Sequence, residues 1–362
     1  MSQKRLTASI SNIFIAITLG LLLVLLWQLR SLIVVLMIAV VIAATLAPII
    51  RAAHKLGIPR WLSVLLVYLS LIATLTGVGL IIGPTVVEQI QRLIRKLPTY
   101  LETVRTLLDE MSLRIAMRDP ENAGLISQFF DIQGATGWVI RSSQELAIRS
   151  FDVTKGFIGG VLGSLLALLL SGYMLSGSDK LLRDIVNLFP QPWNERLADQ
   201  VKPVSQRMGG YIQGRILVSA ILAIVISIGL KFLGLSELAL GLGVIAGFTN
   251  LIPFFGPVLG AIPALIVAIA QGSLTFFGVL LLFIIIQNIE TYLLDPLLVG
   301  SSVKVSPLYQ LLAVLGGAQL LGIIGALIVP PWVAGGAVLL ENLYVKPKLL
   351  AEEKILAQEN VN

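Results

Sequence analysis

Long stretches without a charged residue constrain this chain more than any other feature. Between Leu238 and Ile289 the sequence runs for 52 residues without an Asp, Glu, Lys or Arg side chain. Further uncharged stretches cover 6–29, 31–50, 61–87, 156–178 and 305–340. A helix needs about 20 predominantly apolar residues to cross a bilayer, and no globular core needs segments this long. We therefore predict an all-α, polytopic integral membrane protein with about eight transmembrane helices.

The composition agrees with a membrane protein and excludes several kinds of site. Charged residues make up 13% of the 362-residue chain, against roughly 25% in a typical soluble domain. The chain contains no cysteine and one histidine, His54, so it has neither a disulfide framework nor a Cys/His metal site. We predict no metal and no cofactor. We attribute the net charge of +6 to basic cytoplasmic loops, and not to nucleic-acid binding.

The distribution of basic residues predicts how the chain is oriented in the bilayer. Lys4 and Arg5 precede the first uncharged stretch, and the loop 51–60 holds three basic residues and no acidic one. The tail, 346–362, has two lysines among its first three residues. Short segments rich in Lys and Arg stay in the cytoplasm. Both termini are therefore expected to be cytoplasmic.

Four regions are predicted along the chain. Residues 1–84 form an N-terminal region of three spans, and 85–155 an extramembrane helical region, since nine basic and nine acidic residues fall between Val86 and Lys155. Residues 156–345 form a C-terminal transport region, and 346–362 the cytoplasmic tail.

The first part of the extramembrane region is predicted to be an amphipathic helix. Its apolar residues recur at spacings of three and four: Val86, Ile90, Leu93, Leu97, Leu101, Val104, Leu108, Met111 and Ile115. Such spacing suits packing between helices, and Pro98 is expected to kink this helix or to begin a new one. Two interpretations remain open: the helix packs on its own chain or the membrane surface, or it forms a homo-oligomer through 86–115.

Proline and glycine interrupt the apolar sequence of the C-terminal half. The predicted breaks are at 253–257, Gly260 with Pro263, Gly272, Pro307 and Pro330 with Pro331. Several of the pieces between them are too short to cross a bilayer, so half-helices or re-entrant hairpins are expected. Unwound backbone at membrane depth is tolerated only where it is buried in protein or lines a wet cavity, and freed carbonyls there can coordinate cations.

The first of these breaks supplies most of the candidate path residues. They are Asn250, Pro253, Gly256, Pro257 and Gly260, which we predict to line a path for a substrate or an ion. The alternative is a tight hairpin that binds no ligand.

A second candidate group lies near the end of the long uncharged stretch. Glu290 follows Gln287 and Asn288, and a carboxylate within a membrane helix costs roughly 2.5–3.5 kcal/mol on insertion scales. Glu290 either carries a proton or Na⁺, with the two amides completing a polar site, or lies near the far interface and faces water. Asp295 is interpreted as an ordinary acid at a helix end, and Arg215 as a residue that snorkels to the cytoplasmic interface.

The absence of several motifs narrows the function further. The sequence has no Gly-x4-Gly-Lys-Ser/Thr loop, no HExxH and no GxSxG. ATP is therefore not the direct energy source, and protease or esterase chemistry is not expected. We predict that the chain is not an enzyme, and gradient-driven or facilitated transport remains.

Three segments resemble a known family. GYIQGR (210–215), IPFFGPVLG (252–260) and QNIE (287–290), followed by Asp295-Pro296 and Gly300, together resemble the autoinducer-2 exporter family of bacterial permeases. The order of elements is similar to that family over nearly the whole chain. Ser306 stands before Pro307 where the family often has His, and Thr291-Tyr292 follow Glu290 where Gly-Asn is common.

The resemblance implies a multi-pass protein of the bacterial inner membrane that moves a small solute. The first hypothesis is a secondary or facilitative exporter of a small polar solute similar to autoinducer-2. The second is a Na⁺(Li⁺)/H⁺ antiporter that uses Glu290. The third is a non-transporting membrane scaffold organised by the helix at 86–115. The expected partners are the lipid bilayer, and a small polar solute or a monovalent cation and a proton.

Overall fold

A computed structural model describes residues 17–117 (except 19 and 23), 150–300 and 306–359 of the chain. All regular elements in this part are helical: α2 (Arg30–Lys55), α3 (Arg60–Ala116), α6 (Ser150–Ser176), α7 (Ser178–Val186), α8 (Trp193–Phe232), α9 (Ala239–Thr249), α10 (Phe255–Gln271), α11 (Ser273–Ile289), η1 (Glu290–Val299), α12 (Pro307–Leu340), η2 (Glu341–Val345) and α13 (Lys346–Glu359). η1 and η2 are π-helical. The prediction of an all-α protein is confirmed.

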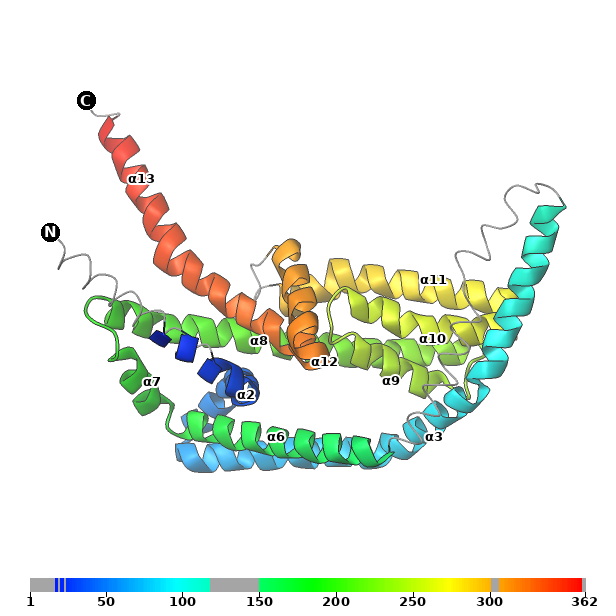
Figure 1. The fold of residues 1–362 in the computed structure, drawn as a ribbon, viewed down its shortest axis with the longest axis horizontal. Helices are drawn as coiled ribbons and strands as arrows, with labels where there is room; N and C mark the ends of the chain where they lie inside the picture. The colour runs from blue at the N-terminus through cyan, green and yellow to red at the C-terminus, as the bar shows by residue number, and fades with distance from the viewer. Residues whose placement is uncertain (1–16, 19, 23, 118–149, 301–305, 360–362) are drawn as a thin grey trace.

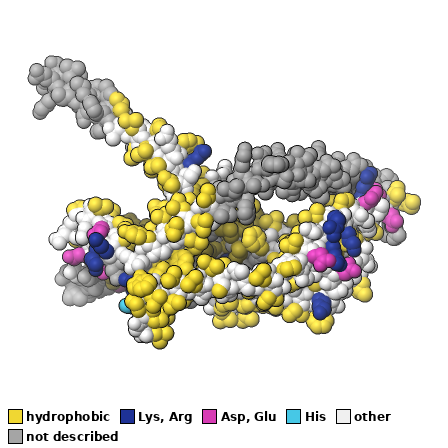
Figure 2. Space-filling model, turned by 90° about the horizontal axis from the view of Figure 1, so that it is seen from below, with side chains coloured by type: hydrophobic (Ala, Val, Ile, Leu, Met, Phe, Trp, Pro, Cys, Tyr) yellow, Lys and Arg dark blue, Asp and Glu magenta, His cyan; other side chains and the backbone are white. Residues whose placement is uncertain are grey.

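Several of these helices are long and apolar enough to cross a bilayer. Five such helices lie within the described residues, or six if the bent pair formed by α6 and α7 is one span. Most of the first predicted span, 6–29, lies outside the described residues, so the total of eight stays a prediction. Figure 2 shows hydrophobic side chains over much of one face, with Lys, Arg, Asp and Glu gathered near its ends. The chain is a polytopic membrane protein.

α3 is one helix that runs through both Pro84 and Pro98. Of the two predicted effects of Pro98, the start of a new helix is excluded, and Figure 1 shows a single helix that bends away from the other spans. Leu93 is buried in the core formed by α8–α11, and the Gln89 side chain accepts a hydrogen bond from the Gly241 backbone N–H at 2.7 Å. This part of α3 packs on its own chain. A homo-oligomer through 86–115 stays a prediction.

α9 and α10 form a helical hairpin in the C-terminal half, beside α11 (Figure 1). α9 has 11 residues, about 16 Å of helix, which is too short to cross a bilayer. Between the two helices lies a tip at 250–254, where Phe254 has a φ of 65°. That value is rare for a residue with a side chain. The predicted break at this position is confirmed, and so are the breaks at Gly272 and Pro307.

A second turn interrupts α12 at Gly322. Its φ of 65° and ψ of −150° are not helical. The turn brings the backbones of Gly317 and Gly325 so close that a Cβ on either would overlap the carbonyl of the other. The predicted breaks at Pro263 and at Pro330 with Pro331 are wrong, because α10 and α12 continue through them. Membrane helices tolerate proline where neighbouring helices satisfy the freed backbone groups.

Small residues permit the close packing of the hairpin. A Cβ at Gly256 would overlap the Thr249 carbonyl and lie 2.5 Å from the Asn250 Cα. A Cβ at Gly260 would lie 2.7 Å from the Ala246 Cα. The two arms therefore approach each other at backbone distance, as small residues allow in membrane proteins.

We expect Gly256→Ala to destabilise the protein, because the added methyl group meets backbone that cannot move aside. Overpacking of this kind costs about 1–3 kcal/mol, which thermal unfolding of the detergent-purified protein should detect as a lower Tm. Gly316→Ala is the control, since nothing lies within 4 Å of its Cβ position. Equal Tm values for the two variants would contradict the packing described here.

Candidate functional site

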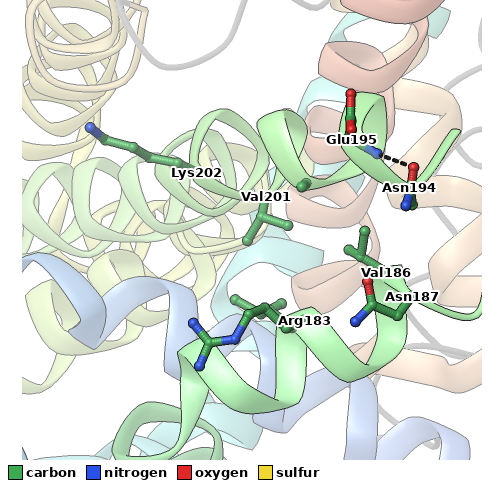
Figure 3. A pocket seen from close by; sticks show the side chains of 9 residues that line it. Arg183, Val186, Asn187, Asn194, Glu195, Val201 and Lys202 are labelled. Atoms are coloured by element: carbon green, nitrogen blue, oxygen red, sulfur yellow. Dashed lines mark hydrogen bonds between the residues drawn. The ribbon is translucent and has the colours of Figure 1, made fainter. Parts of the chain in front are cut away.

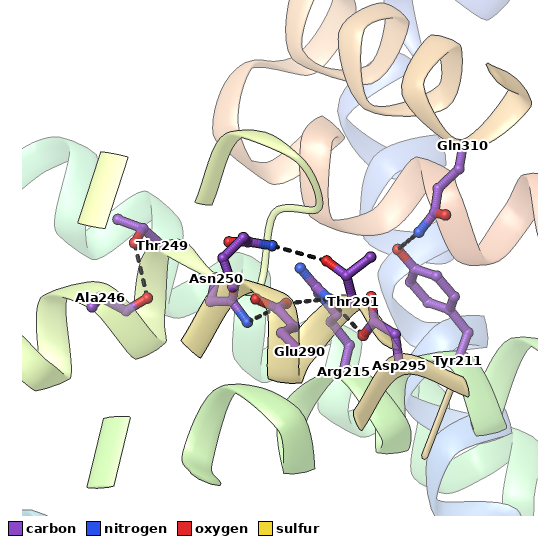
Figure 4. Close-up of polar contacts among 10 residues, drawn as sticks. Tyr211, Arg215, Ala246, Thr249, Asn250, Glu290, Thr291, Asp295 and Gln310 are labelled. Atoms are coloured by element: carbon purple, nitrogen blue, oxygen red, sulfur yellow. Dashed lines mark hydrogen bonds and ion pairs between the residues drawn. The ribbon is translucent and has the colours of Figure 1, made fainter. Parts of the chain in front are cut away.

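A buried arginine in the middle of α8 organises the candidate site (Figure 4). Arg215 is 5% exposed, and its Nη1 lies 3.1 Å from Oε1 of Glu290 and 3.2 Å from Oδ1 of Asp295. Both carboxylates come from η1. The interpretation of Arg215 as a snorkelling interfacial residue is wrong, and so is that of Asp295 as an ordinary helix-end acid. Arg215 is bound to the two carboxylates because a guanidinium buried in apolar surroundings needs a counter-charge.

The tip of the helical hairpin completes the cluster. Asn250, at the end of α9, is 2% exposed, and its Nδ2 donates to Oε1 of Glu290 at 3.0 Å. Glu290 itself is 3% exposed. The same carboxylate oxygen therefore accepts from an arginine of α8 and from an amide of the hairpin. We call Arg215, Asn250, Glu290 and Asp295 the arginine cluster.

The wide turns of η1 bring both carboxylates to the same nitrogen. In an α-helix, residues three and four apart share a face, and residues five apart do not. A π-helix is bonded from residue i to i+5, as in the 2.6 Å hydrogen bond from the Gly300 N–H to the Asp295 carbonyl. Glu290 and Asp295 are five apart, so the π-helical turn lets both reach Nη1. π-helical turns occur frequently at functional sites.

Gly214 allows η1 to lie directly against α8. A Cβ at this position would overlap the carbonyl of Leu298. The backbone of η1 thus contacts the residue that precedes Arg215 in the chain. A side chain larger than hydrogen at position 214 would push the two carboxylates away from the guanidinium.

The arginine cluster carries more negative than positive charge when its groups are ionised. One guanidinium faces two carboxylates, and both contacts use the same nitrogen. Burial makes the remaining negative charge costly. Asp295, whose side chain is 41% exposed, reaches toward the surface, whereas Glu290 lies inside. The two carboxylates therefore lead from the protein interior, at Glu290, to a solvent-accessible position, at Asp295.

Three buried polar atoms near the cluster lack a hydrogen-bond partner among the described residues. They are Nε of Arg215, Oδ1 of Asn250 and Oγ of Ser219. Ser219 is one helical turn beyond Arg215 on α8, and its backbone carbonyl lies against Gly247 of α9. Buried polar atoms are usually paired, so these oxygens are available to a ligand that binds at the interface between α8 and α9.

The cluster is connected to α12 through Tyr211. The hydroxyl of this buried residue accepts a hydrogen bond from Nε2 of Gln310 at 3.3 Å. Tyr211 is one turn before Arg215 on α8, and Figure 4 shows it beside Asp295. α12 is therefore linked to the same face of α8 as the cluster.

The structure unites only some of the residues predicted to form a path. Asn250 and Glu290 meet in the arginine cluster. Pro253, Gly256, Pro257 and Gly260 belong to the hairpin tip and the first turns of α10, where the two glycines serve close packing.

The two amides before Glu290 make other contacts. The side chain of Gln287 donates to the Thr291 hydroxyl at 3.3 Å, and that of Asn288 to the Ile284 carbonyl at 2.7 Å. Arg215 and Asp295 were not predicted as site residues. The signal available was their charge: opposite charges inside apolar helices are expected to pair.

Comparisons with known proteins give one consistent family. Residues 13–344 match the model of the AI-2E family transporter. YrrI of Bacillus subtilis (strain 168) is 29% identical over 310 residues, which cover 83% of this chain and 84% of YrrI. YueF of the same organism is 27% identical over 297 residues, covering 78% and 76%. The names of both assign them to transport and state no substrate.

A further relative has a more specific name. The sodium-lithium/proton antiporter of Halobacillus andaensis is 22% identical over 306 residues, which cover 82% of this chain and 85% of that protein. The similarity thus extends over most of both chains at low identity.

We expect Arg215→Gln to destabilise the protein, because two carboxylates lose their shared counter-charge. Removing one partner of a buried ion pair costs about 3 kcal/mol or more, so Tm in detergent should fall well below that of Lys231→Gln, which removes an exposed charge from the same helix. Adding Glu290→Gln to Arg215→Gln should recover part of the loss. A Tm for Arg215→Gln equal to that of the control would refute the structural role of the ion pairs.

Proposed function

Because the chain belongs to the AI-2E transporter family, and is thus a membrane transporter, we propose that it exchanges Na⁺ or Li⁺ for protons through the arginine cluster. The observation that carries this proposal is the pair of carboxylates, Glu290 and Asp295, around the single guanidinium of Arg215. The low-identity similarity to a sodium-lithium/proton antiporter over most of the chain supports it.

The charge of the cluster supports a site that is occupied alternately by a proton and by a cation. With one guanidinium and two carboxylates ionised, one negative charge remains uncompensated. A proton on either carboxylate neutralises it, and so does a bound monovalent cation. Since both neutralise the same charge, their binding is mutually exclusive, and that competition is the basis of exchange.

The available donors suit a small, hard cation. Carboxylate, amide carbonyl and hydroxyl oxygens are the ligands that such cations prefer. Glu290 supplies a carboxylate oxygen, Asn250 an amide oxygen (Oδ1) and Ser219 a hydroxyl oxygen (Oγ). The last two oxygens have no hydrogen-bond partner among the described residues. Binding a cation there requires Arg215 to withdraw from Glu290, because the guanidinium now occupies the same carboxylate oxygen as the Asn250 amide.

The direct test uses proteoliposomes that contain a pH-sensitive dye. Addition of Na⁺ or Li⁺ outside should make the interior of wild-type vesicles more alkaline, with a smaller response to K⁺. Glu290→Gln should reduce the initial rate by about tenfold or more, because it removes the charge for which proton and cation compete.

Glu237→Gln is the matched control, since Glu237 is an exposed carboxylate outside the arginine cluster, paired with Lys96 at 3.4 Å. It should keep the wild-type rate. A wild-type protein that moves no protons in response to any of the three cations would end the antiporter proposal.

Export of a small polar solute similar to autoinducer-2 is the second candidate, and the family to which the chain belongs favours it. The α9–α10 hairpin and the turn at Gly322 in α12 offer it a path. Efflux of labelled polar metabolites from wild-type vesicles, retained in Glu290→Gln, would support this candidate. Neither activity in wild-type vesicles would favour the scaffold organised by 86–115.

We further propose that the protein lies in the bacterial inner membrane with both termini in the cytoplasm. The chain has no cysteine, so single substitutions can be labelled without background. In intact cells, a membrane-impermeant maleimide should label Ser236→Cys, at the α8–α9 connection, and should label Ala351→Cys, in α13, only after permeabilisation. Both positions are exposed. Labelling of Ala351→Cys in intact cells would reverse the orientation.

A further inference from the structure

A cavity of about 440 Å³ lies between α7 and the beginning of α8, outside the arginine cluster (Figure 3). α6, the fourth predicted span, is followed by α7 after a bend of 89°. A helix that leaves a span at a right angle runs along the membrane surface. The chain then turns at 190–192 and returns as α8, so the cavity lies at the end of the fourth predicted span, on the side that we propose to be cytoplasmic.

The lining of the cavity is amphiphilic. Its apolar part consists of Leu182, Val186, Ala198 and Val201, and its polar part of Arg183, Asn187, Asn194, Glu195 and Lys202. Figure 3 shows the polar side chains coming from both helices. A ligand that fits this lining has a polar or charged end and an apolar end. The volume lies within the range of roughly 300–1,000 Å³ that is usual for small-molecule sites.

The charges of the lining favour an anion. Arg183 and Lys202 form no ion pair with any described residue, and they outnumber the single carboxylate, Glu195. Among the side chains that the structure describes, neither of these two cations has an acidic partner, so both can bind a phosphate group.

The surroundings of the cavity are suited to contact with lipid. Ile185, Leu188, Phe189 and Trp193 are between 47% and 80% exposed, and they lie along the same α7–α8 connection. Exposed apolar side chains next to basic ones are typical of helices at the membrane interface. Trp193, with Arg196 stacked 5.6 Å from its ring centre, is the kind of aromatic residue found at that depth.

We propose that this cavity binds the headgroup of an anionic phospholipid, with Arg183 and Lys202 supplying the positive charge that attracts the phosphate. Asn187 and Asn194 supply amide groups for the glycerol oxygens. Leu182 and Val186 contact the first methylene groups of the acyl chains. The bound lipid then holds α7 against α8 at the membrane surface.

The test measures the thermal stability of the full-length, delipidated protein in a neutral detergent with added phosphatidylglycerol. The lipid should raise Tm of the wild type, and phosphatidylcholine or inorganic phosphate should not. In Arg183→Gln/Lys202→Gln the apparent affinity for phosphatidylglycerol should fall by about tenfold or more, since each basic residue near the surface contributes to attraction of anionic lipid.

The control variant removes the same amount of charge away from the cavity. Lys180→Gln/Lys231→Gln alters two exposed lysines, one on α7 and one at the end of α8, neither of which lines the cavity. It should keep the wild-type affinity. A second variant, Arg183→Lys/Lys202→Arg, retains both charges and should bind within a few-fold of the wild type, which separates loss of charge from loss of folding.

Three outcomes would overturn the proposal. Equal loss of affinity in the control would show that total charge, and not the cavity, attracts the lipid. An equal Tm increase with phosphatidylcholine would show that the headgroup charge is not recognised. An increase with inorganic phosphate alone would identify a soluble anion, and not a lipid, as the ligand.

Discussion

The contact of Arg215 with Glu290 and Asp295 is the interaction on which the C-terminal half depends. It joins α8 to η1, and through the amide of Asn250 it also fixes the tip of the α9–α10 hairpin. A buried ion pair in an apolar medium contributes little net stability, because desolvation offsets much of the attraction. Its effect is to favour one arrangement of the helices: any arrangement that separates the guanidinium from the two carboxylates leaves an unpaired charge in a medium of low polarity.

This property suits a protein that must have more than one conformation. If a proton or a cation neutralises part of the cluster, the constraint that holds hairpin, α8 and η1 together becomes weaker, and other arrangements of the same helices become accessible. The close backbone contacts at Gly214 and Gly256 act in the opposite direction, since they favour one well-defined packing. The two effects thus act in opposite directions on the position of the hairpin tip.

Much of the fold was predictable from the sequence, because long uncharged stretches permit few structures other than membrane helices. The broken character of the C-terminal half was also predictable, since Gly272 and Pro307 act locally on the backbone. The breaks predicted at Pro330 and Pro331 were wrong because whether proline breaks a helix also depends on neighbours that are distant in the sequence. The arginine cluster depends on such neighbours as well, since Arg215 and Glu290 are 75 positions apart.

Asp295 illustrates a more specific limit of sequence analysis. The helical periods used to group residues on one face assume α-helical geometry, in which positions five apart diverge. Only a π-helical turn makes them neighbours, and the sequence of Glu290–Val299 contains no pattern that predicts such a turn. Asn250 and Glu290 were identified separately, as a break residue and as a membrane carboxylate, but their contact required the hairpin to fold back.

The continuity of α3 through two prolines has a mechanical consequence. Its 57 residues correspond to about 85 Å of helix, nearly three times the hydrocarbon thickness of a bilayer. One end stands among the spans, and the other projects beyond them after contacting α9 and α10. A straight helix of this length acts as a lever: a tilt of 10° about its midpoint displaces each end by about 7 Å. A small change of tilt inside the bilayer thereby produces a large displacement of the projecting end of α3. The α9–α10 hairpin contacts α3 near the midpoint of this rotation.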